Sequence, residues 1–555
     1  MSSRVGLGFR MRQAGAVSGP LVTSIGHAGL RVEAPDLKLL CDPWLSGGGA
    51  FLGSWFQFPD NSHLRTVPGL LECDWVAVSH EHLDHMDLKL LAAMPDHVRV
   101  VIPRYPSAVC KQRLTSAGVK HVIEVEAWQR LPLNTRGDWL TVIPEQSPMC
   151  HDAAFLIMAD GVSIMHTNDA RLSLAQVRRA MSEVGGPLDL MALQMSGASW
   201  HPICYDYPAE VIAKICADKR ANKFKAVTRL VRSVKPRLAL PYAGPPAFLD
   251  PRLAHHNKQI PEPGIFPDQL QAANWLRDRV KDLETLVMLP GDTIQITPRH
   301  HEITRDPHWE DFSFDDSSAV SNHLEAYAAS RANEIAALWD AHPDPAAGSG
   351  TAERFTDHFL RLGEMNPYFL DRIAMTVRFD VGGADGGVWD VHLGPDKTVV
   401  DIDPTDRIGT DSVQYKLSME ARWLNAVLTG EVRWEDLFLS LRFQSWRSPD
   451  VYNDYLVGLL KHADADALAA VQEFETNRDP DDLVTLRSGD TAYEVTRYCP
   501  HAGEDMAEGA VIEQTPEGPV LRCLAHNFDF SLTTGACLNA KCDPIRVKPA
   551  LAVTS

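Results

Sequence analysis

A short run of histidines and acids constrains this chain more than any other part of its sequence. The run Ser79–His85 follows the apolar stretch Trp75–Val78 and offers four metal-binding side chains: His80, His82, Asp84 and His85. Side chains so close in sequence converge on an ion only where the chain turns tightly, as it does in strand-to-helix loops. The pattern therefore predicts a metal centre at the end of a strand.

A second group of metal-binding residue types lies near the C-terminus. Cys499 and His501 are separated by one residue, and Cys523 and His526 follow further along the chain. Two thiols and two imidazoles suit either zinc or a 2Fe-2S cluster with Cys on one iron and His on the other. Zinc fingers pair Cys with Cys and His with His, whereas each segment here contributes one of each. The arrangement favours the cluster.

Length and charge narrow the class of protein. A chain of 555 residues predicts three or four domains at about 150 residues each, and 45% hydrophobic with 23% charged residues excludes a disordered chain. The formal net charge of −20, without a long basic run, argues against nucleic acid as a partner. No stretch of about 18 apolar residues is present, so we expect no membrane partner and a cytoplasmic location.

The order of predicted elements divides the chain into three domains. Strands and helices alternate over residues 15–310, which is typical of a layered α/β sandwich. Residues 311–475 open with helices, turn strand-like and return to helices, which predicts an α+β middle domain. Residues 480–555 read as strands and turns, so we expect a small all-β domain.

The N-terminal motif resembles that of the metallo-β-lactamase fold, an αββα sandwich, whose HxHxDH pattern His80, His82, Asp84 and His85 match. The resemblance implies that His80 and His82 help to hold one ion and that Asp84 and His85 hold a second. Non-haem Fe(II), as one or two ions, and zinc both suit such a donor set. The identity of the metal stays open at this point.

Three further residues fit the family by their positions after predicted strands. The resemblance implies that Asp42 braces the metal loop, that His151 is a ligand and that Asp169 bridges two ions. Together, the predicted catalytic and metal-binding residues of this domain are His80, His82, Asp84, His85, His151 and Asp169.

The last histidine that the family would supply is missing. Tyr242 occupies its expected position, and His201, His255 and His256 are the substitutes that the sequence offers. A depleted second site favours one ion or an asymmetric pair.

The C-terminal segment resembles Rieske domains through its two Cys-His loops and through the run HNFDFSLTTGACL. The resemblance implies a 2Fe-2S cluster held by Cys499, His501, Cys523 and His526. Rieske proteins of respiratory complexes also carry a disulfide between the loops, but Glu504 and Ala525 occupy those positions here. The domain therefore resembles the ferredoxin and oxygenase type, with Cys537 and Cys542 as ordinary thiols.

The combination resembles CMP-N-acetylneuraminate hydroxylase-type iron oxygenases, through runs such as CDPWLSGGGAFLGSW and ALQMSGASWHPICYDYP, although the Rieske module is last here. The resemblance implies an O₂-dependent monooxygenase that hydroxylates a small polar metabolite and takes electrons from a ferredoxin, a cytochrome or an NAD(P)H-dependent reductase. N-oxygenation of an amine is the alternative with the same machinery. A zinc hydrolase with a redox-sensing Rieske appendage is the competing class, and an electron-transfer protein is the third.

The middle region and three arginines carry further expectations. The middle region, especially SMEARWLNAVLTGEVRWEDLFLSLRF, resembles sterol-carrier domains and is expected to pack the modules together or to shape a pocket. Arg229, Arg232 and Arg237 are candidates for binding an anionic group. A homo-oligomer is compatible with the sequence.

Overall fold

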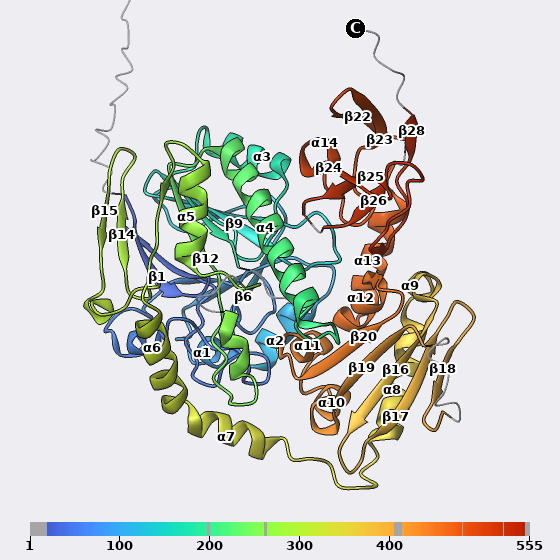
Figure 1. The fold of residues 1–555 in the computed structure, drawn as a ribbon. Coiled ribbons are helices and arrows are strands. Elements are labelled where there is room, and N and C mark those ends of the chain that lie inside the picture. Colours follow the sequence, from blue (N-terminus) through green and yellow to red (C-terminus); the bar gives the residue numbers. More distant parts are fainter. Residues whose placement is uncertain are drawn as a thin grey trace, which may run out of the picture.

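The computed structural model describes residues 19–196, 200–259, 264–404, 413–479, 481–525 and 527–549. Two sheets lie face to face in its N-terminal part (Figure 1). The first has the order β15-β14-β1-β2-β3-β4-β5-β6, formed by β1 (Leu21–Gly26), β2 (Gly29–Ala34), β3 (Leu37–Cys41), β4 (Trp75–Ala77), β5 (Arg99–Pro103), β6 (Val122–Val125), β14 (Thr293–Ile296) and β15 (His301–Thr304). The second has the order β13-β12-β11-β10-β9-β8-β7, formed by β7 (Arg130–Pro132), β8 (Trp139–Pro144), β9 (Ala153–Ala159), β10 (Val162–His166), β11 (Leu190–Gln194), β12 (Leu238–Tyr242) and β13 (Glu284–Thr285).

Helices cover the outer face of each sheet. The first sheet carries α1 (Leu88–Ala92) and α2 (Val109–Ser116), and the second carries α3 (Leu174–Val184), α4 (Ala209–Val234) and α5 (Gln269–Arg279). Apolar residues of both sheets, such as Leu39 and Phe155, form the core between them. Burial of both faces explains why these strands read as apolar runs rather than as alternating ones. The predicted αββα sandwich is therefore confirmed.

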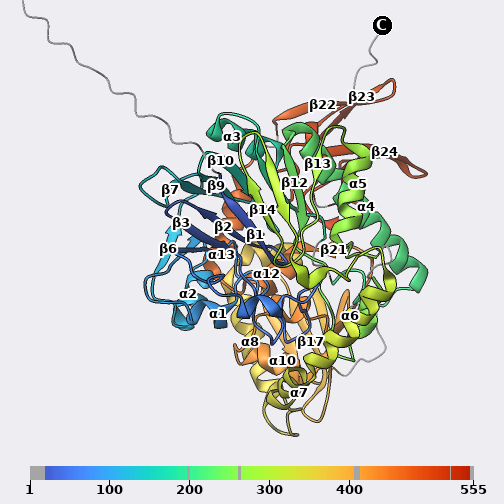
Figure 2. The same ribbon diagram turned by 90° about the vertical axis from the view of Figure 1, so that its left-hand side faces the viewer.

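The middle of the chain is α+β. The helices α6 (Ser317–Ser330) and α7 (Ala332–Ala341) lead to it along the outside of the molecule (Figure 2). A five-stranded sheet of order β18-β17-β16-β19-β20 follows, made of β16 (Met375–Gly382), β17 (Gly387–Leu393), β18 (Thr398–Asp401), β19 (Tyr415–Glu420) and β20 (Phe443–Arg447). Alternate residues are buried in β16 and β19, because one face packs on helices. These helices are α8 (Thr351–Met365), α9 (Pro367–Ile373), α10 (Ala421–Leu428) and α11 (Trp434–Leu439).

Two helices connect this region to the C-terminal strands. They are α12 (Asp454–His462) and α13 (Ala465–Thr476), which lie between the middle sheet and the C-terminal strands in Figure 1. The C-terminal part holds two three-stranded sheets and a short helix: β22 (Leu483–Ser488) with β23 (Thr491–Thr496) and β28 (Val547–Pro549), β24 (Ala510–Thr515) with β25 (Gly518–Cys523) and β26 (Asp529–Ser531), and α14 (Met506–Gly509). A parallel pair, β21 (Tyr452–Asn453) with β27 (Ala540–Lys541), joins this part to the start of α12.

The register of the first sheet places several loops at one edge. Leu30 of β2 pairs with Cys41 of β3, and Cys41 pairs with Ala77 of β4. The β1–β2 turn, the residue after β3 and the loop after β4 therefore lie together. No helix within the described ranges is long and apolar enough to cross a membrane.

Candidate metal centre and cluster site

Asp42 holds the metal loop in place. Its two carboxylate oxygens accept hydrogen bonds from the Ser79 backbone N–H and hydroxyl, both at 2.7 Å, and one lies 3.0 Å from Nδ1 of His85. The loop turns tightly, because the backbone N–H groups of His85 and Met86 both donate to the carbonyl of His82. Asp42 therefore braces the loop, as the resemblance predicts, and the other nitrogen of His85 faces the site.

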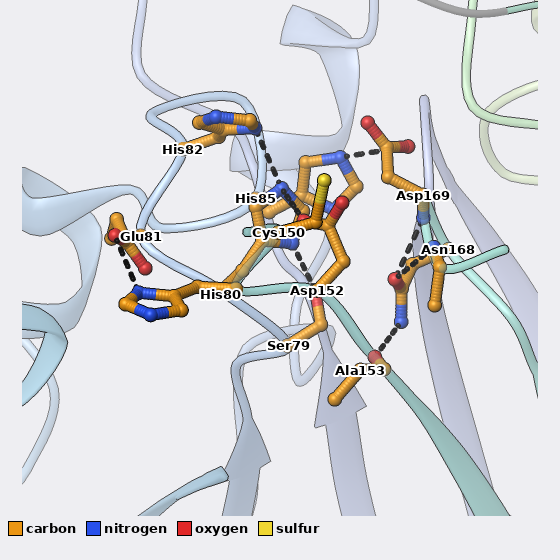
Figure 3. A network of polar contacts seen from close by, with 12 residues as sticks. Ser79, His80, Glu81, His82, His85, Cys150, Asp152, Ala153, Asn168 and Asp169 are labelled. Atoms are coloured by element: carbon orange, nitrogen blue, oxygen red, sulfur yellow. Dashed lines mark hydrogen bonds and ion pairs between the residues drawn. The ribbon is translucent and has the colours of Figure 1, made fainter. Parts of the chain in front are cut away.

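His80, His82 and Asp169 form the first possible ion-binding group, which we call the outer group. Nε2 of His80 lies 2.8 Å from Nδ1 of His82, while the other nitrogen of His80 contacts the Ser79 hydroxyl at 2.9 Å. Their side chains point toward a common space that Asp152 and Asp169 also border (Figure 3). Asp169 follows β10 of the second sheet and lies in one group with His80 and His82.

A second possible group, the inner group, contains one residue that the sequence analysis missed. His27, Asp84 and His85 each offer a ligand atom within 4.8 Å of the others. Nε2 of His27 lies 3.0 Å from the Asp84 carboxylate, and Nε2 of His85 lies 3.4 Å from that of Asp169. His27 sits in the β1–β2 turn with a positive φ of 49°. The Gly-flanked turn SIGHAGL, at the same sheet edge as Asp42, was the signal available.

The buried atoms of these groups suit a metal. Four of them, Nδ1 of His27, Oδ1 of Asp84, Nε2 of His85 and Oδ1 of Asp169, make no hydrogen bond, although buried polar atoms normally do. Burial opposes the charge of His85, but Asp169 and Asp84 raise its pKa well above the usual range. Imidazole and carboxylate donors of this kind fit Fe(II) or zinc.

His151 lies in neither group. Its Nδ1 is 3.6 Å from the Glu81 carboxylate, and its ring stacks on Tyr105 at 4.9 Å between centroids. The neighbouring Asp152 approaches instead, with a carboxylate oxygen 3.6 Å from Nε2 of His80. Asp152, rather than the predicted ligand His151, therefore borders the outer group.

The Tyr242 hydroxyl hydrogen-bonds to residues outside both groups. The Tyr242 hydroxyl lies 2.5 Å from Nδ1 of His166 and accepts from the Asn168 N–H at 2.6 Å. His201, His255 and His256 belong to neither possible ion-binding group. Among the described residues, His27 is the histidine from outside the HxHxDH motif that forms a possible ion-binding group with Asp84 and His85.

The middle region contributes charged residues that the sequence analysis did not identify. The Glu435 carboxylate, at the start of α11, lies 3.1 Å from Nε2 of His82 and 2.9 Å from Nζ of Lys461. Arg433 forms an ion pair of 2.9 Å with Glu81. Burial lowers the pKa of His82, but Glu435 outweighs it and raises that pKa to about 9. No local motif marks Glu435, because more than 350 residues separate it from His82.

The cluster loops lie side by side in the C-terminal part. Cys499 and Cys523 are both fully buried, and the Cys523 thiol lowers the pKa of Cys499 to about 6 by hydrogen bonding. The guanidinium of Arg478 donates to the carbonyls of Cys499 and His501, both at 2.9 Å. Nε2 of His501 lies 2.6 Å from the Asp454 carboxylate of α12.

These residues fit a 2Fe-2S cluster. Two adjacent buried thiols supply one half of the donor set, and the contact of Nε2 with Asp454 turns the other nitrogen of His501 toward them. His526 lies outside the described residues. Glu504, at the position of the respiratory-type cysteine, is half-buried, and this partial burial raises its pKa to about 7.

A cleft separates the metal domain from the cluster loops. Ala170 and Arg171, next to Asp169, line one side with Lys223 and Arg229 of α4, and Leu524 and Ala525 of the second cluster loop line the other. Burial lowers the pKa of Lys223 to about 8. Of the three arginines predicted to bind an anion, Arg229 lines this cleft, while Arg232 donates to the Arg279 carbonyl and Arg237 lies 3.6 Å from Asp189.

Comparisons with known proteins agree with both sites. Residues 21–243 match the β-lactamase superfamily domain, and residues 459–549 match the Rieske [2Fe-2S] domain. A Rieske 2Fe-2S iron–sulfur protein of Mycobacterium tuberculosis is 29% identical over 545 residues, covering 95% of this chain and 99% of that protein. The cytidine monophosphate-N-acetylneuraminic acid hydroxylase of Danio rerio is 23% identical over 464 residues, covering 80% of this chain and 71% of that enzyme.

One solved structure with a similar fold is a diiron β-hydroxylase from Streptomyces venezuelae, at 18% identity and a TM-score of 0.33, covering 52% of this chain and 54% of that one. The two family matches show that the chain joins a metallo-β-lactamase-fold domain to a C-terminal Rieske [2Fe-2S] domain, the pair of modules that the sequence predicted.

Proposed function

We propose that the protein is a Rieske-dependent non-haem iron monooxygenase that hydroxylates a small polar metabolite. One observation carries the proposal: a single chain holds a histidine–carboxylate centre and a cluster site, and both contact the same middle region through Glu435 and Asp454. A hydrolytic zinc centre needs no electrons, whereas O₂ activation by iron needs them one at a time. The homology to a hydroxylase supports the same reaction class.

The residues divide the work as follows. The outer group, His80, His82 and Asp169, would hold the ion that faces substrate, because it is the less buried group. The inner group, His27, Asp84 and His85, would hold a second ion. When bound, iron supplies O₂ binding and one-electron chemistry. One oxygen atom enters the substrate and the other leaves as water, with two electrons and two protons supplied from outside.

The cleft supplies a place for the substrate. It lies between the loop that carries Asp169 and the second cluster loop, so a bound molecule would lie between the two centres. Lys223 and Arg229 favour an anionic group on that molecule, and Leu524 favours an apolar part. These features support a small acid, whether the oxygen is inserted at carbon or at nitrogen.

Metal analysis with EPR on anaerobically purified protein tests this function without knowledge of the substrate. We expect a Rieske signal after dithionite and iron beyond the two ions of the cluster. Zinc in the histidine–carboxylate groups, with turnover that needs neither O₂ nor reductant, would instead establish the hydrolase.

A pair of variants separates the two classes further. His82→Ala should abolish turnover in either class, because it removes a ligand of the outer group. Cys523→Ser should stop only an oxygenase, because it removes the cluster and leaves the metal groups intact. Full activity of the Cys523 variant without reductant would contradict the proposal.

A further inference from the structure

Helix α12 reaches both centres with residues on one of its faces. It spans Asp454–His462, and the Asn453 side chain caps its start by accepting from the Leu456 N–H. Asp454 and Lys461 are seven residues apart, which is two helical turns, so their side chains lie on the same side. At about 1.5 Å per residue, about 10 Å of helix separates them.

The first end of α12 contacts the cluster. The Asp454 carboxylate lies 2.6 Å from Nε2 of His501 and is almost completely buried. A carboxylate that accepts from a ligand imidazole makes that ligand a stronger donor.

The other end of α12 reaches the metal loop through Glu435 of α11. Lys461 lies 2.9 Å from Glu435, whose carboxylate lies 3.1 Å from Nε2 of His82. The last residue of the helix, His462, is anchored on the Met149 carbonyl at 3.1 Å. A continuous series of contacts thus joins one predicted cluster ligand to one predicted metal ligand.

We propose that α12 couples the two centres within one chain, with Asp454 and Glu435 as the residues that position His501 and His82. The inference rests on the proposed function for its direction of transfer. One electron leaves the reduced cluster, which is oxidised by one electron, and reduces by one electron the ion at the outer group. An external iron–sulfur or flavin protein replaces the electron in the cluster.

The proposal gives the middle region a role. A carboxylate on the cluster ligand favours the oxidised cluster and so lowers its reduction potential. The transfer also needs no second subunit, because the contacts run through α12 and the start of α11 of the same chain. Both consequences are open to direct measurement.

The first test is an EPR-monitored redox titration of the holoprotein. Asp454→Asn should raise the midpoint potential of the cluster while cluster content is retained. The matched control is Asp268→Asn, the same substitution at a buried acid of the metal domain that caps α5 by accepting from the Gln271 N–H at 2.7 Å. An unchanged potential in the Asp454 variant would overturn the proposal. If Asp454→Asn loses the cluster, Asp454→Glu keeps the charge and should restore both content and potential.

The second test asks whether the electron stays in one chain. Reduced protein is mixed with O₂, and the decay of the cluster signal is followed by rapid-freeze EPR at several protein concentrations. We expect decay that is independent of concentration, and slower decay in Glu435→Gln at an unchanged cluster potential. A mixture of Cys523→Ser with His82→Ala should decay no faster than His82→Ala alone.

Recovery of fast decay in that mixture would show transfer between chains and overturn the proposal. A wild-type cluster that decays as slowly as His82→Ala would instead count against iron at the outer group. In that case the proposed function fails, while the potential shift of Asp454→Asn still decides whether Asp454 acts on the cluster ligand.

Discussion

The outer and inner ligand groups of the metal centre differ in their surroundings. His82 and Asp169 of the outer group retain 15% and 14% of their side-chain exposure, whereas His27 and His85 of the inner group retain 4% and 0%. The outer group is contacted by Glu435 from the middle region, while the inner group is braced by Asp42 from the same sheet. Under the proposed function, this difference would let substrate and electrons reach an ion in the outer group and would keep an ion in the inner group in a closed site.

Removing a ligand of the outer group should have the largest effect on metal content and turnover. His82→Ala should lose the outer ion and all turnover, with an affinity loss above the roughly 10–100-fold that loss of a supporting contact costs. Metal content by mass spectrometry and EPR checks the result. Retention of the outer ion would mean that His82 serves only as a partner of Glu435.

Removing His27 tests the inner group alone. His27→Ala should reduce the bound non-cluster metal from two ions to one per chain, because it removes the imidazole that completes the inner group with Asp84 and His85. His256→Ala is the matched control, since His256 is a buried histidine outside both groups. Two ions in the His27 variant would show that His27 is not a ligand, whereas one ion in the unmodified protein would show a mononuclear centre.

The pH dependence of metal binding should also separate the groups. Metal-free protein carries a protonated His82 below about pH 9, because burial lowers its pKa but Glu435 raises it more. Metal binding must displace that proton, so affinity at the outer group should rise with pH until about 9 and then level off. In Glu435→Gln the rise should end at lower pH. Calorimetry of metal binding to the metal-free protein, in buffers of different ionisation enthalpy, measures the protons released. Equal proton release from the unmodified protein and from Glu435→Gln would contradict the role of Glu435 in raising the pKa of His82.

The sequence predicted the residues that lie close together along the chain. The HxHxDH loop, Asp42 and the αββα sandwich follow from a motif and from apolar strands whose order is readable. His27, Glu435 and Asp454 could not be found in this way, because each reaches its centre through sheet register or helix packing between distant segments. For His151, the strand position was readable, but the orientation of its ring toward Glu81 depends on packing against Tyr105 and His462.

The smallest expected effect concerns Tyr242, which stands where the family places a ligand. Tyr242→Phe should leave both ions bound, because the hydroxyl is engaged with His166 and the Asn168 N–H rather than with either group. The variant leaves two buried polar groups without this partner, so the free energy of unfolding should fall by about 1–3 kcal/mol. Chemical denaturation followed by circular dichroism measures the loss, and metal analysis runs in parallel. A change in metal content with little change in stability would reverse the argument, because it would place the phenol on the inner ion and make His27 its supporting neighbour.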